Sequence, residues 1–136
     1  MAYEQFEHTA DIGVRANGKD LEEAFAEAAK GLFSVMTNIE KVDSVGEYHI
    51  EMSARDHEEL LVDFLSELVY LFEVESLLFS EFEVDIKSND EKTLLVKARG
   101  ERIDHDKHEL KKAVKAVSYH DIKVDPKGEI QVIFDV

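Results

Sequence analysis

The residues DHEELLVDFLSELVYLFEV, Asp56–Val74, have the most regular pattern in the chain and predict its central helix. Asp56 followed by Glu59 is the capping-box pattern that begins a helix. Apolar side chains then recur three and four residues apart on one broad face: Leu60, Leu61, Phe64, Leu65, Leu68, Val69 and Phe72. A face this wide has to be covered by the rest of the chain, so the fold is built around this helix.

The same aspartate–glutamate spacing recurs at Asp20 and at Asp106 and predicts two further helices. One runs from Asp20 to about Met36, and the other from Asp106 to about Ala116. The first has Leu21, Ala24, Phe25, Ala28, Leu32 and Val35 on one face, and the second has Leu110, Ala113, Val114 and Val117.

Alternating apolar residues between these segments predict strands with one buried face. Turn sequences at 88–91 and 125–128 join neighbouring strands as hairpins, which favours antiparallel pairing. We therefore predict an α+β fold in which a mostly antiparallel or mixed sheet of about six to seven strands carries three helices on its apolar face. The strands are centred on Tyr3–Glu7, Ile12–Ala16, Tyr48–Met52, Phe82–Ile86, Leu94–Ala98, Ile122–Val124 and Ile130–Phe134.

Length and composition narrow the possible functions. The 136 residues fit one domain, 1–136, and the absence of cysteine excludes disulfides and thiolate chemistry. No signal-peptide pattern or membrane-length apolar run is present, so we expect a cytoplasmic protein without a membrane partner. A net charge of −15 opposes direct binding to nucleic acid, so any RNA would be reached through a partner. The acidity is equally well explained as a solubility device.

Asp11 is the first candidate site residue, because it stands with His8 and Thr9 at the entrance to a strand. A local role as a turn or strand cap explains it on its own. At the other end of the chain, Asp135 and the terminal carboxylate of Val136 close an apolar strand. If the first and last strands are neighbours, these acids meet and require protons or a cation. Oxygen ligands favour Ca²⁺, Mg²⁺ or Mn²⁺.

A second candidate segment, Lys115–His120, leaves a predicted helix and enters a strand. Lys115 and His120 would be the positive or proton-handling complement of the acids, although an exposed lysine beside a half-buried tyrosine explains the segment as well. We expect solvated or capping roles for the remaining histidines, His49, His57, His105 and His108. The chain has no phosphate-binding glycine loop and no serine-hydrolase motif.

Together, the motif His8–Gly13, the segment Asp56–Tyr70, the segment Lys115–His120 and the Asp-aliphatic end resemble the archease family over nearly the whole chain. The one departure is Ser118, where threonine is expected. The resemblance implies a non-catalytic activator of the RNA-splicing ligase RtcB, which seals tRNA halves with GTP and Mn²⁺ through a guanylylated histidine. The activator promotes guanylylation and turnover and broadens nucleotide use.

The resemblance also implies a divalent-cation site, described with Ca²⁺ in the family, at Asp11, Asp135 and Val136, and a functional lysine at Lys115. Two other functions stay open. The same acids could hold the metal of a stand-alone phosphate or ester hydrolase. Alternatively, the apolar face of the Asp56–Val74 helix could bind client proteins in a chaperone-like module.

Overall fold

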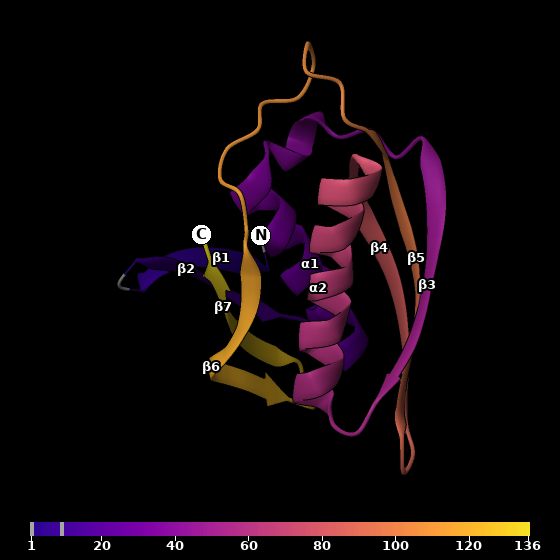
Figure 1. The fold of residues 1–136 in the computed structure, drawn as a ribbon. Coiled ribbons are helices and arrows are strands. Elements are labelled where there is room, and N and C mark those ends of the chain that lie inside the picture. Colours follow the sequence, from indigo (N-terminus) through magenta and orange to yellow (C-terminus); the bar gives the residue numbers. More distant parts are fainter. Residues whose placement is uncertain (1, 9) are drawn as a thin grey trace.

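The computed structural model describes residues 2–8 and 10–136, and in these residues the chain forms two helices and seven strands (Figure 1). Thr9, which belongs to the candidate motif around Asp11, lies outside the described residues. The elements in chain order are β1 Tyr3–His8, β2 Asp11–Asn17, α1 Leu21–Met36, the short 3-10 turn η1 Ile39–Lys41, β3 Gly46–Ala54, α2 His57–Glu75, β4 Leu77–Ser88, β5 Lys92–Arg102, β6 Ala116–Asp125 and β7 Glu129–Asp135.

The strands form two antiparallel sheets, with the order β1-β2-β7-β6 in one and β3-β5-β4 in the other. Figure 1 shows both helices lying between the sheets. The α+β class and the antiparallel pairing are confirmed, but the expectation of one sheet is wrong. The reason lies in α1, which buries Ala26, Ala29 and Phe33 in addition to its predicted face. A helix that is apolar on several sides needs cover from more than one layer.

Both helices begin as their sequences predict. The Asp20 and Asp56 carboxylates each accept a hydrogen bond from the backbone N–H three residues on, at 2.8 Å in both cases. Neither helix in the described residues has the combination of length and apolar composition that crossing a membrane requires.

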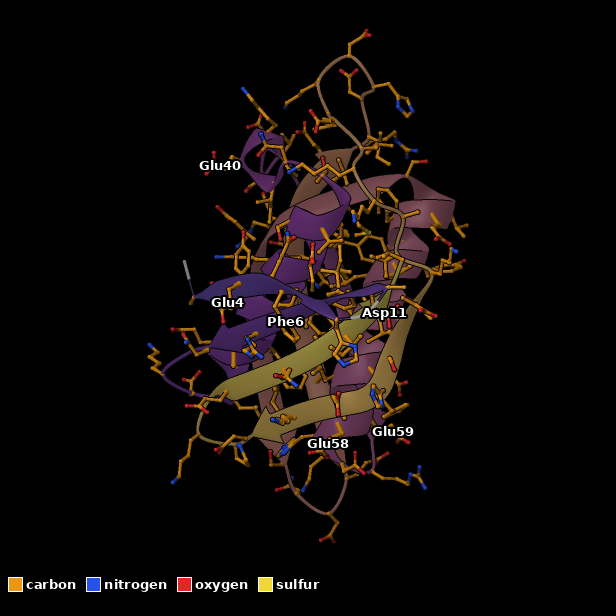
Figure 2. The ribbon with its side chains drawn as sticks, turned by 90° about the vertical axis from the view of Figure 1, so that its left-hand side faces the viewer. Glu4, Phe6, Asp11, Glu40, Glu58 and Glu59 are labelled. Carbon is orange, nitrogen blue, oxygen red and sulfur yellow. The ribbon has the colours of Figure 1, made fainter. Side chains whose placement is uncertain are left out.

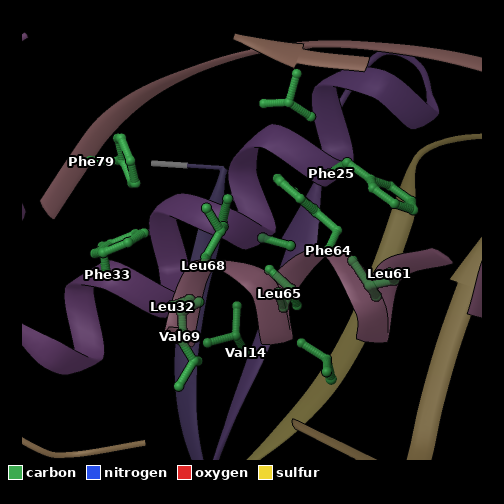
Figure 3. Packing of buried hydrophobic residues seen from close by; sticks show 14 of the residues in the cluster. Val14, Phe25, Leu32, Phe33, Leu61, Phe64, Leu65, Leu68, Val69 and Phe79 are labelled. Carbon is green, nitrogen blue, oxygen red and sulfur yellow. The ribbon is translucent and has the colours of Figure 1, made fainter. Parts of the chain in front are cut away.

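The apolar face of α2 is the centre of the core (Figure 3). Phe64 is fully buried and stacks on Phe25 with ring centres 6.2 Å apart, and its ring lies edge-on to Phe82. Leu65 and Leu68 are also fully buried. This face is occupied by the protein's own side chains, so it supplies no surface for client proteins.

The predicted third helix, Asp106 to about Ala116, is wrong: residues 103–115 form the long loop at the top of Figure 1. The Asp106 N–H donates to the Asp104 carboxylate, and Leu110 is 41 % exposed. Tertiary contacts replace the helix, because the loop amides of Lys111 and Lys112 donate to the last carbonyls of α1 at 2.8 and 3.3 Å. Those carbonyls would otherwise lack partners at a helix end.

Candidate functional site

The pairing of β2 with β7 brings the two candidate acids together. Ile12 lies opposite Phe134, and the same register continued by one position sets Asp11 beside Asp135. Asp11 is half-buried, Asp135 is exposed, and Val136 follows directly as a half-buried residue. The last strand therefore neighbours the second strand of the chain, and the acids from the two ends lie side by side.

The contact between these two carboxyls changes the pKa of Asp11. Hydrogen bonding to the Asp135 carboxyl raises the pKa of Asp11, and desolvation and the Asp135 charge raise it further. The imidazoles of His8 and His120 act in the opposite direction. Two carboxylates can share a hydrogen bond only when one holds a proton, so this position accepts either a proton or a cation.

Asp11 lies at the outer face of the four-stranded sheet, which Figure 2 views directly. Phe6 lies over Gly13, and a Cβ at Gly13 would clash with the Phe6 ring. The Arg15 guanidinium lies over this ring, 4.0 Å from its centre. Glycine at position 13 thus lets an aromatic ring lie flat on the strand that presents Asp11.

The long loop brings lysines to the same end of the sheet. The Lys115 N–H donates to the Asp135 carbonyl at 2.7 Å, and Ala116 pairs with Asp135 in the sheet. Lys112 lines a surface pocket of about 500 Å³ together with Asp11 and Val136. The loop that replaces the predicted helix is therefore the element that sets basic residues beside the acids.

His120 also lies in this region, with partners that the sequence did not suggest. Its Nε2 is 3.3 Å from the Asp121 Oδ2, and the His8 Nε2 lies 3.1 Å from the same oxygen. The two imidazole rings meet edge to face with centres 5.5 Å apart. His8 was one residue of the opening motif, but its partner Asp121 had no sequence signal because it lies within an ordinary strand pattern.

A network around the buried His108 holds the base of the loop. The sequence predicts a solvated or capping role for His108, and because it is only 3 % exposed the solvated alternative is wrong. Its Nδ1 accepts the Asp104 N–H at 2.9 Å, and its Nε2 therefore carries the proton and donates to Glu101 at 2.9 Å. Lys107 and the Asp43 N–H donate to the same Glu101 oxygen at 2.7 and 2.8 Å. His49 and His105 are exposed, in agreement with the prediction.

This network gives a pH-dependent stability. The Asp43 N–H, Lys107 and His108 lower the pKa of Glu101 from 4.5 to about 2. A depressed pKa stabilises the fold at pH values above the ordinary pKa, and this contribution is lost as the pH falls through 4.5 toward 2. We expect Glu101→Gln to lower the free energy of unfolding at pH 7 by about 2 kcal/mol. The difference from wild type should shrink below pH 4.5.

Urea unfolding at several pH values between neutral and acid measures this effect. Glu47→Gln is the matched control, because Glu47 also has a lowered pKa next to His49 and Arg99 but belongs to an exposed pair. The network does not stabilise the loop if Glu101→Gln lowers the free energy of unfolding no more than Glu47→Gln does. The same conclusion holds if the decrease does not change with pH.

The predicted residues thus gather in one region. Asp11, Asp135 and Val136 lie together, the backbone of Lys115 is bonded to Asp135, and His120 lies across the outer face beside Asp121. His8 completes the cluster from β1. The arrangement offers carboxylate oxygens for a hard cation and, next to them, imidazole nitrogens.

Comparisons with a family model, with curated proteins and with solved structures all lead to the same family. A sequence model described as "Archease protein family (MTH1598/TM1083)" matches residues 3–136. The chain is 48 % identical to a protein archease of Pyrococcus furiosus over 90 % of this chain and 87 % of that one. It is 37 % identical to one of Methanosarcina mazei over 98 % and 95 %. The solution structure of Methanobacterium thermoautotrophicum protein 1598 superposes with a TM-score of 0.85 and 38 % identity, covering 99 % of each chain.

Proposed function

The chain belongs to the archease family, and from this premise we propose that it activates the RNA-splicing ligase RtcB by promoting guanylylation and turnover and by broadening nucleotide use. It acts as a non-catalytic partner in tRNA splicing. RNA is reached only through the ligase, and the place of action is the cytoplasm. The net charge of −15 supports an indirect route to RNA, because the molecule repels phosphates.

One observation carries the proposal: the β2–β7 pairing places Asp11 beside Asp135 and Val136. In the proposal these residues hold a divalent cation, Ca²⁺ as in the family, or Mg²⁺ or Mn²⁺. The donors fit such an ion, since all of them are oxygens and the Asp135 carboxyl raises the pKa of Asp11. The cation would neutralise this end of the sheet and fix its shape.

Lys115 and His120 are the proposed partner-activating residues. Lys115 adjoins Asp135 through its backbone, and His120 lies on the outer face with an exposed side chain. Both therefore stand at the rim of the acidic site, where a docked ligase would meet them. Electrostatic attraction between an acidic protein and a basic ligase surface would speed the encounter and set its orientation.

The test is single-turnover guanylylation of the ligase with increasing amounts of this protein. We expect stimulation that saturates at stoichiometric ratios. The protein is first stripped with a chelator that is then removed, so that the Mn²⁺ of the ligase stays untouched. Stimulation should fall with stripped protein and return when Ca²⁺ is added.

The protein alone, incubated with Mg²⁺ or Mn²⁺ and nucleotide or RNA, serves as the comparison for a hydrolase. Turnover by the protein alone, or guanylylation that does not respond to it, would contradict the proposal.

A further inference from the structure

The outer face of the four-stranded sheet holds a second set of candidate ligands next to the acids. His8 comes from the end of β1, and His120 and Asp121 come from β6. One ligand atom from each side chain lies within 4.8 Å of the others. We propose that His8, His120 and Asp121 form a separate binding site for a borderline divalent transition-metal ion such as Zn²⁺.

An irregularity in β6 builds this set. In a regular strand, consecutive side chains point to opposite faces, so His120 and Asp121 could not both reach His8. The β6–β7 register instead jumps between Ser118 and Lys123, which are paired with Ile133 and Gln131. Asp121 has a positive φ of 55° within this bulge. The bulge turns two neighbouring ligands toward one point, as bulges often do near functional sites.

Hydrogen bonds fix the bulge in this form. The Gln131 side-chain amide donates to the Asp121 carbonyl at 3.0 Å, and the His120 N–H donates to the Ser118 hydroxyl at 2.9 Å. The positions of both ligand-bearing residues are therefore set by backbone contacts rather than by the ligand side chains themselves. The imidazole and carboxylate groups contact one another at this point, and in the proposal a bound ion replaces these contacts.

Two of the three distances between the ligand atoms match a coordination shell. Two ligands that each bind Zn²⁺ at about 2.1 Å lie about 3.0 Å apart at a right angle and about 3.4 Å apart at a tetrahedral angle. The Asp121 Oδ2 lies 3.1 Å from the His8 Nε2 and 3.3 Å from the His120 Nε2. Both values fall within this interval. The His120 side chain is 68 % exposed, and in the proposal its ring turns to bring the two nitrogens to the same spacing.

The donor set distinguishes this site from the neighbouring acids. Ca²⁺ and Mg²⁺ take oxygen ligands, whereas imidazole nitrogen favours Zn²⁺ and similar ions. Three protein ligands with an exposed side leave a coordination position open for water or for a group from a partner. The charge of Asp11 and Asp135 nearby adds attraction for any cation.

Zn²⁺ binding to the chelator-treated full chain, measured by calorimetry at pH 7.5 in excess Ca²⁺, tests the inference. We expect one Zn²⁺ per chain. His120→Ala and Asp121→Asn should each weaken Zn²⁺ binding by at least about tenfold. His49→Ala is the matched control, because His49 forms an exposed pair with Glu47 at 2.6 Å on the other sheet. It should leave the Zn²⁺ affinity unchanged.

Imidazole NMR spectra give a readout that does not depend on variants. Zn²⁺ should shift the ring resonances of His8 and His120 and leave those of His49 and His105 in place. The inference is overturned by the absence of Zn²⁺ binding in excess Ca²⁺, by equal affinity in His120→Ala and wild type, or by ring shifts confined to other histidines. In those cases the three side chains form a surface hydrogen-bond network only.

These measurements use the protein without a ligase, so they stand apart from the proposed function. Normal Zn²⁺ binding with no effect on guanylylation would reject the activator role alone. Full stimulation of a ligase by a protein that binds no Zn²⁺ would reject the second metal site alone.

Discussion

Replacing Asp135 by asparagine is expected to reduce stimulation of ligase guanylylation by at least about tenfold and to weaken Ca²⁺ binding by a similar factor. The substitution removes one of the two adjacent carboxylates of the proposed cation site, and a neutral amide oxygen is a poorer ligand for a hard ion. Because Asp135 is exposed, the free energy of unfolding should change by less than about 0.5 kcal/mol. Guanylylation rates and calorimetric Ca²⁺ titration measure the two effects.

Asp85→Asn is the control for Asp135→Asn, since it makes the same change in net charge at an exposed position on the three-stranded sheet. It should stimulate the ligase as wild type does. Asp11→Asn should reproduce the loss seen with Asp135→Asn, because in the proposal the two acids hold one ion. A correctly folded Asp135→Asn protein with full stimulation would show that the acids have no part in activation.

The largest effect on stability is expected for Phe64→Ala, which should lower the free energy of unfolding by about 3–5 kcal/mol. Phe64 is fully buried, stacks on Phe25 and meets the edge of Phe82 from the three-stranded sheet. Removing the ring takes away contacts among α1, α2 and that sheet and leaves a cavity. Urea unfolding followed by circular dichroism measures the loss.

Tyr70→Ala provides the comparison within the same helix, because this side chain is 50 % exposed. Tyr70→Ala should lower the free energy of unfolding by less than about 1 kcal/mol. The comparison therefore separates the loss of core packing from any change in helix propensity. Equal costs for the two variants would mean that α2 is not the centre of the core.

The elements that could be predicted from the sequence are those whose local pattern and tertiary surroundings agree. Asp20 and Asp56 cap their helices as expected, since each precedes a long apolar face that the sheets then cover. Asp106 has the same capping spacing, yet its segment is a loop. The Thr37 hydroxyl donates to the Glu109 carbonyl, and the last carbonyls of α1 accept hydrogen bonds from the segment, contacts that local spacing does not reveal.

The acidic part of the site could be inferred because strand alternation fixes which side chains share a face. Ile12 and Phe134 point inward, so their neighbours Asp11 and Asp135 share the opposite side once β2 and β7 pair. Asp121 could not be found this way. Its orientation depends on the bulge in β6, and a bulge breaks the alternation on which the inference relies.

The same bulge separates β6 into two blocks that hold their register independently, Ala116–Ser118 and Lys123–Asp125. An insertion or deletion between the two blocks need not change the pairing of either one, because the residues between them are already unpaired with β7. A change of length at His120 and Asp121 should therefore leave the acids and the final hairpin where they are.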